Sequence, residues 1–296
     1  MPTFDTREPI SVTIAIGVGD VRITAGDRRD TVVMVSPGDS SKPSDLKAAE
    51  QTRVEYSDGR LLIKAAKSWK RYTPFGGGES IDVAIELPAG SRVDGEASLG
   101  DFSCAGRLGE CRLTTGAGNL RLDETGTLQL STGAGSVTVD RAVGRADVSG
   151  SGQVRIGKID GPAVIKNLNG VTWLGEVTGD LRCNSANGDI TVDRALAGVS
   201  AKTASGAVRI GEVVRGSIEL GTSYGELEVG IREGTAALLD ARSQFGSVHS
   251  SLAASDGPGP SDQTVEVRAR TSFGDILIHR SQASAVATEA ETGGEK

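Results

Sequence analysis

Residues 118–139 read GNLRLDETGTLQLSTGAGSVTV, and the glycine-led phrases at the two ends of this stretch are 17 residues apart. Both phrases have the form Gly-polar-apolar-any-apolar. Further copies of this form begin at Gly100, Gly152, Gly170, Gly188, Gly206, Gly225, Gly246 and Gly274. The steps are 17–19 residues through most of this region and lengthen to 21 and 28 residues at its end. A period in this range is typical of stacked-repeat architectures.

A second glycine-led phrase lies half a period after the first, as in GTLQL at Gly126 and GPAVI at Gly161. Each repeat therefore contains two short segments in which apolar and polar residues alternate. Alternation with period two places one face of a strand inward and the other outward, and glycine allows the sharp corner between strands. The pattern predicts an all-β, single-chain parallel β-solenoid of roughly ten rungs, each of 17–19 residues.

Aligning the rungs produces vertical columns of equivalent residues. One inward column contains Leu120, Val137, Val154, Thr172, Ile190, Val208 and Leu227, and the second strand contributes Leu113, Leu130, Val148, Ile165, Cys183, Ala201 and Leu220. A polar column three residues before the glycine contains Thr115, Thr132, Ser149, Asn167, Ser185, Thr203, Thr222 and Thr271. We expect the polar side chains to bond to the turn backbone or to a neighbouring rung.

The residue just before the corner glycine changes from small to aromatic along the chain. It is Ala117, Ala134, Ser151, Asn169, Asn187 and Ser205 in the earlier repeats, then Tyr224, Phe245 and Phe273. The longer steps occur in the same region. We therefore expect a core that widens toward the C-terminal end.

The repeat divides the chain into three parts. Residues 1–98 form a less regular β region of early rungs or a cap, 99–280 form the regular solenoid, and 281–296 lack apolar periodicity, which predicts a disordered tail. In the first part we predict strands at 10–16, 20–24, 31–35, 52–56, 60–64 and 81–87, and a short helix from Ser44.

Composition narrows the possible functions. The net charge of −7 disfavours nucleic acid and anionic membranes as partners. No apolar run is long enough to span a bilayer, and no leader sequence is visible, so we expect a cytoplasmic protein. Cys104, Cys111 and Cys183 fall at inward positions and read as buried hydrophobes. With two histidines and no CxxC pair, no metal site or cofactor is predicted.

Two features are candidate contact surfaces. The insertion 65–80 interleaves positive charges with aromatic rings, the set being Lys64, Lys67, Trp69, Lys70, Arg71, Tyr72 and Phe75. It is either a loop that covers the end of the stack or a docking patch for an acidic partner or a membrane surface. Trp173, in a mixed outward column, is the second candidate, and Arg155 is the only arginine of that column close enough to stack on its ring.

Three features carry a resemblance to a known family: the ladder of GxLxL phrases, the segment GGESIDVAIELPAGSRV at 77–93 and the segment RTSFGDILI at 270–278. Together they resemble the bacterial "putative adhesin" family, also called the toastrack domain, and its actinobacterial soluble members in particular. The resemblance covers about residues 5–280. It implies a single-chain β-solenoid without established catalysis, with relatives beside envelope-stress membrane proteins. It offers no catalytic motif to transfer.

These observations predict a non-enzymatic protein-interaction or scaffold module, linked through the resemblance to cell-envelope or stress processes. Its protein partner is unknown, and self-assembly through open strand edges is one option. Two alternatives stay open: a polysaccharide-binding or polysaccharide-active β-helix, and a membrane-surface sensor that docks through residues 64–75.

Overall fold

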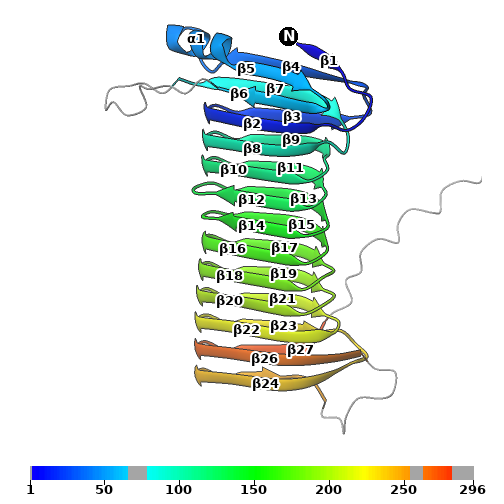
Figure 1. Cartoon of the computed structure of the whole chain (residues 1–296). Helices are drawn as coiled ribbons and strands as arrows, with labels where there is room; N and C mark the ends of the chain where they lie inside the picture. Colours follow the sequence, from blue (N-terminus) through cyan, green and yellow to red (C-terminus); the bar gives the residue numbers. More distant parts are fainter. Residues whose placement is uncertain (1, 66–78, 254–262, 282–296) are drawn as a thin grey trace, which may run out of the picture.

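The computed structural model describes residues 2–65, 79–253 and 263–281. In these residues the chain is a stack of β-strands with one short helix, α1 (Pro43–Gln51), at the N-terminal end (Figure 1). The strands form two sheets on either side of a thin core, and most strand pairs are parallel. The predicted all-β parallel solenoid is confirmed, and each rung consists of one strand from either sheet.

The first sheet, here called sheet A, carries the strands that follow the corner glycines at Gly118 and its equivalents. In spatial order it contains β1 (Thr3–Asp5), β4 (Asp30–Pro37), β7 (Ile81–Pro88), β3 (Val21–Gly26), β9 (Phe102–Arg107), β11 (Leu120–Thr125), β13 (Val137–Val143), β15 (Val154–Asp160), β17 (Thr172–Val177), β19 (Ile190–Ala195), β21 (Val208–Val213), β23 (Leu227–Ile231), β27 (Ile276–Arg280) and β25 (Val248–Ser250).

The facing sheet B carries the other strand of each rung. In spatial order it contains β24 (Thr235–Phe245), β26 (Gln263–Phe273), β22 (Gly216–Tyr224), β20 (Val199–Ser205), β18 (Leu181–Asn187), β16 (Ala163–Asn169), β14 (Ala146–Gly150), β12 (Leu128–Thr132), β10 (Cys111–Ala117), β8 (Arg92–Leu99), β2 (Ser11–Val18), β6 (Arg60–Lys64) and β5 (Arg53–Ser57). Among the described strands, antiparallel pairing occurs for β1 with β4, β4 with β7 and β5 with β6.

The core lies between the two sheets and is built from the predicted columns. Leu120 pairs with Val137 and Val137 with Val154, and these side chains are at most 1% exposed. In sheet B, Leu130 pairs with Val148 and is equally buried. Because equivalent residues lie directly above one another, each apolar side chain is covered by the same position of the next rung.

The polar column at the corners forms a hydrogen-bond ladder between rungs. The hydroxyl of Thr132 donates to the carbonyl of Gly118 at 2.9 Å, and Thr115, Thr203, Thr222 and Thr271 make the equivalent bond in other rungs. The predicted bonding to a neighbouring rung is confirmed for these residues.

The prediction for Ser149 was wrong by one residue. Gly150, not Ser149, pairs with Asn167 and occupies the ladder position. Ser149 pairs with Ser131 instead and bonds to its hydroxyl. This rung places one residue fewer between the sheet B strand and its corner glycine, so counting back from the glycine misplaced the column.

The expected widening of the core at the C-terminal end was also wrong. Tyr224, Phe273 and Phe245 are 59%, 44% and 65% exposed and lie on the outer surface. The position before the corner glycine faces outward in the described rungs, as the polar Asn169 and Asn187 in the same column show.

The N-terminal end is closed by a cap. The predicted strands and helix of this region are present, and β1 and β8 are two further strands that the sequence analysis did not predict. The rung of β2 and β3 lies between β8 and β9 on one side and β6 and β7 on the other, so the chain first runs outward and then returns. At the outer end, Phe4 of β1 contacts Tyr56 of β5 across the two sheets, with ring centroids 5.1 Å apart.

The C-terminal end shows the same reversal of order. The rung of β26 and β27 lies between the rung of β22 and β23 and the terminal strands β24 and β25, although it comes last in the sequence. Strand β26 presents Val265, Val267 and Ala269 to the core, each at most 2% exposed. The equivalent residues of β24 are Ala237, Leu239 and Ala241, which pack against the core but are only half-buried, because β24 has a paired neighbour on one side among the described residues.

Candidate interaction surface

The predicted basic-aromatic patch lies almost entirely outside the described residues. Of its members, only Lys64 is described: it is exposed at the end of β6 and pairs with Arg53 of β5. Lys67, Trp69, Lys70, Arg71, Tyr72 and Phe75 lie outside the described residues.

Trp173, the second predicted contact residue, is held in place by side chains of the same chain. It is half-buried on the outer face of β17. The guanidinium carbon of Arg155 lies 4.1 Å from the centroid of its ring, as the sequence analysis predicted, and its indole nitrogen donates to Asp193 at 3.2 Å. Burial raises the pKa of Asp193, and the bond from Trp173 opposes this. The contacts of Trp173 join three successive rungs, so packing within the chain accounts for this residue.

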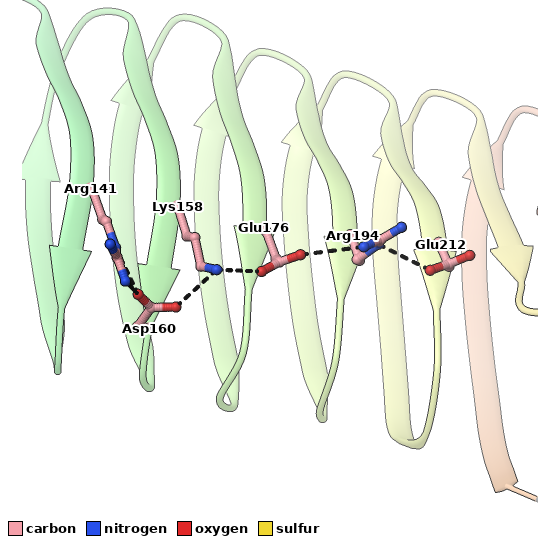
Figure 2. A network of polar contacts seen from close by, with 6 residues as sticks. All are labelled: Arg141, Lys158, Asp160, Glu176, Arg194 and Glu212. Atoms are coloured by element: carbon pink, nitrogen blue, oxygen red, sulfur yellow. Dashed lines mark hydrogen bonds and ion pairs between the residues drawn. The ribbon is translucent and has the colours of Figure 1, made fainter. Parts of the chain in front are cut away.

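A ladder of ion pairs runs along sheet A (Figure 2). Arg141 binds Asp160 at 2.6 Å, Lys158 lies 3.0 Å from Glu176, and Arg194 of the next rung reaches both Glu176 and Glu212. Opposite charges face each other across consecutive rungs because Lys158, Glu176, Arg194 and Glu212 are paired in register. If a strand paired one rung further along, Lys158 would face Arg194 and Glu176 would face Glu212. Because like charges repel, the ladder favours the observed order and register of these strands.

Glu212 is the most buried acid of this ladder. Its side chain is 13% exposed and accepts hydrogen bonds from Arg232 at 2.7 Å and from the hydroxyl of Ser281 at 3.0 Å. Burial alone would raise the pKa of Glu212, but the bonds from Arg232 and Ser281 and the charge of Arg194 outweigh it and lower the pKa from its usual 4.5.

We expect Glu212→Gln to lower the free energy of unfolding by about 1 kcal/mol at neutral pH, because a charge-assisted pair is lost at a partly buried site. A carboxyl whose pKa is lower in the folded state stabilises the fold above its unfolded pKa of about 4.5, and this contribution disappears as the pH falls through the folded value. Urea unfolding of both proteins over a pH series would measure this. A difference that stays constant into strong acid would contradict the assignment.

The three cysteines are buried and unpaired. Burial raises the pKa of Cys111 to about 11 and that of Cys183 to about 12, and it also raises the pKa of Cys104. Thiols with such pKa values carry little thiolate at neutral pH and are poor nucleophiles. They pack as small hydrophobes, as the sequence analysis predicted.

An open groove of about 600 Å³ crosses the corners of sheet B. Its lining includes Thr132, Gly150, Asn167, Leu168 and Asn184. Asn167 is 3% exposed, and its side-chain nitrogen donates to the carbonyls of Gly152 and Gly170. Its side-chain oxygen is buried and has no partner. The groove is shallow and wide open, so it does not enclose a ligand in the way that a binding pocket does.

The most distinct exposed surface is an aromatic stack at the corner of the last three rungs. The rings of Tyr224 and Phe273 are 5.0 Å apart with an interplanar angle of 2°, and those of Phe273 and Phe245 are 4.8 Å apart at 10°. The pairings of Tyr224 with Phe273 and of Phe273 with Phe245 hold the rings in line. The sequence analysis noticed these residues but assigned them to the core.

The described residues therefore define a class: a β-solenoid repeat protein whose outer surface consists of ion-pair ladders, polar corners and one aromatic stack. Within residues 2–65, 79–253 and 263–281, no group of three acidic, histidine or cysteine side chains could hold a metal ion. The model of the Toastrack DUF4097 family matches residues 11–293. The chain belongs to this family.

The solved structures that match this chain are distant from it in sequence. One is a "putative adhesin" from Parabacteroides merdae, with 12% identity, 77% of this chain and 94% of that chain covered, and a TM-score of 0.44. Another, from Bacteroides fragilis, is also described as a "putative adhesin" and is 14% identical in sequence. That match covers 94% of this chain and 95% of that chain, with a TM-score of 0.33. A third, described as a "putative lipid binding protein" from Parabacteroides distasonis, is 14% identical in sequence. That match covers 95% of this chain and 96% of that chain, with a TM-score of 0.34. No curated protein matches the chain. None of the helices in the described part of the chain is long and apolar enough to cross a membrane.

Proposed function

We propose that this protein is a non-enzymatic interaction module that binds a protein partner through the aromatic stack of Tyr224, Phe273 and Phe245. The observation that carries the proposal is the exposure of three aligned rings on a rigid parallel sheet. Exposed aromatic patches are rare on isolated domains and are enriched in protein interfaces. Because the rings are already ordered by the strands below them, binding costs little side-chain entropy.

The remaining polar surface supports a structural rather than a catalytic role. Charged side chains such as Arg141, Lys158 and Glu176 are engaged in ladders that follow the strand register, and Trp173 is clasped by its neighbours. Three unpaired buried cysteines support a reducing compartment, and so a cytoplasmic location, as part of the same proposal. The link to cell-envelope or stress processes stays a prediction from family resemblance.

Crosslinking followed by affinity capture from the native cell tests this proposal. We expect the wild-type chain to capture a specific protein that the double variant Tyr224→Ser, Phe273→Ser loses. Leu168→Ser is the matched control, because Leu168 is as exposed as Tyr224 but lies on an earlier rung, and it is expected to retain the partner. Equal capture by all three proteins, or binding of polysaccharide with no protein partner, would contradict the proposal.

A further inference from the structure

Among the described strands, the C-terminal end of the stack is an unpaired edge. Strand β24 is 11 residues long and is the last strand of sheet B, with β26 on its only paired side among the described residues. It is drawn at the end of the stack in Figure 1. A long free edge presents a row of backbone N–H and C=O groups to which another strand can pair.

This edge strand is also unusually apolar for an exposed element. Leu238 and Phe245, at 69% and 65%, are the most exposed large apolar side chains in the described part of the chain, and both lie on β24. On the inner side of the same strand, Ala237, Leu239 and Ala241 pack against the core but are only half-buried. The apolar interior of the solenoid therefore continues to the end of the stack without a covering layer among the described residues.

The opposite end differs in the length of its sheet B edge and in its covering contacts, whereas sheet A ends in a strand of three residues at both ends, β25 here and β1 there. The outermost strands of the opposite end are β1 and, in sheet B, β5 with only five residues. They pair antiparallel with their neighbours, the contact between Phe4 and Tyr56 closes the gap between the sheets, and α1 packs against β4. Short, covered edges of this kind are how natural sheets avoid edge-to-edge pairing.

We infer that a second copy of this chain occupies the free edge, with β24 of the two copies paired antiparallel about a two-fold axis. One open and one capped end exclude a head-to-tail filament, because such a filament would need both ends. A two-fold axis perpendicular to the sheets pairs open end with open end. It extends sheet A into sheet A and sheet B into sheet B, so the two cores become continuous.

The charges on β24 fit this arrangement. Asp240 and Arg242 lie on the outer face of the strand, and Ala241 lies between them on the inner side. If Ala241 faces its equivalent across the two-fold axis, Asp240 of each copy lies opposite Arg242 of the other. The strand is therefore complementary to itself in charge, which a strand with two charges of one sign could not be.

The size of the end face fits a small, reversible dimer interface. The eleven residues of β24 at about 3.3 Å each make an edge about 36 Å long in sheet B, and the three residues of β25 make an edge of about 10 Å in sheet A. With about 10 Å of width for each sheet, the two strands present about 460 Å² on each copy, or about 900 Å² in total, which lies at the low end for specific complexes. This inference goes beyond the proposed function, because the second copy binds the edge of β24 and not the aromatic stack.

Light scattering coupled to gel filtration, over a wide range of protein concentration, tests the inference on the full chain. We expect a wild-type dimer that dissociates only on dilution. Leu238→Lys places a charge on the edge and is expected to raise the dimer dissociation constant at least about tenfold. Leu168→Lys, at a 59% exposed position away from the end, should leave it unchanged. A wild-type monomer at every concentration, or a dimer that tolerates Leu238→Lys, would overturn the inference.

A charge exchange tests the antiparallel register. Arg242→Asp makes both outer charges negative and Asp240→Lys makes both positive, so each variant alone should be monomeric. An equimolar mixture should form a heterodimer, since opposite charges then face each other at both positions. Circular dichroism melts establish that both variants fold. Failure of the mixture to associate would refute this register. A monomeric wild type that still captures a protein partner through Tyr224 and Phe273 would refute the dimer and leave the proposed function intact.

Discussion

Substituting Gly135 by alanine is expected to cost more than about 4 kcal/mol and to prevent the solenoid from closing at that corner. Gly135 has φ +142°, a backbone conformation that side chains disfavour. A Cβ there would lie 2.1 Å from the carbonyl oxygen and 2.6 Å from the carbonyl carbon of Gly118 in the adjacent rung. Moving the rungs apart to relieve this clash would break the 2.8 Å hydrogen bond from the backbone N–H of Gly118 to the carbonyl of Ala134 and would separate the paired core residues Leu120 and Val137.

Gly150, close to the same series of corners, provides the matched control. A Cβ at Gly150 would find its nearest neighbour, the γ2-methyl of Thr132, at an ordinary 3.5 Å. Gly150→Ala is therefore expected to change stability by less than about 0.5 kcal/mol or to increase it slightly. Urea unfolding measures the loss, and limited proteolysis with mapping of the cut sites shows whether it is local. Equal stability of the two variants would contradict the stacking of the corner glycines.

Substituting Phe102 by alanine is the second change with a large expected effect, a loss of about 3–5 kcal/mol. Phe102 is 1% exposed and is the largest fully buried side chain in the described residues. Its ring fills space left free by Gly95, where a Cβ would come within 2.7 Å of the ring. Phe102 pairs with Val21 on one side and Leu120 on the other, so the cavity would open where the N-terminal rungs join the regular stack.

Phe245→Ala is the control for this prediction, because it removes the same side chain from an exposed site. Its expected cost is below about 1 kcal/mol, since it loses one stacked neighbour and no buried area of comparable size. Chemical denaturation at a fixed protein concentration compares the two variants, and hydrogen exchange shows whether β2 and β3 lose protection first in Phe102→Ala. Similar costs for the two phenylalanines would show that Phe102 does not join the two regions.

Much of the fold could be predicted because its signals are local. The alternation in Leu120, Arg121 and Leu122 indicates which side chains face inward, and the hydroxyl ladder follows from the spacing of Thr115 and Thr132. The error at Ser149 arose from one missing residue in a turn, which changes the count without changing the pattern. The ion-pair ladder was missed although its signal was present, since Glu176, Arg194 and Glu212 alternate in charge at the repeat period.

The candidate surface was less predictable than the core. The aromatic residues Tyr224, Phe245 and Phe273 were assigned to a widening core because the switch from small to aromatic residues coincides with longer repeat steps, whereas the polar members of their column already indicated an outward position. Trp173 was predicted as a contact together with its partner Arg155, but the bond to Asp193 depends on how far a side chain reaches across rungs. That reach is a property of rotamers and packing, which the repeat pattern does not contain.

The sequence by itself determined that this chain coils into stacked two-strand rungs with glycine corners, because period and alternation act on neighbouring residues and hold in every copy. Only the tertiary structure decided the order of the rungs at the two ends. Parallel repeats of similar pattern can pair in more than one order, and the order is set by contacts between residues far apart in the sequence, which the local pattern does not contain. The observed order places β26 inside and leaves β24 as the free edge among the described strands, from which the proposed self-association follows.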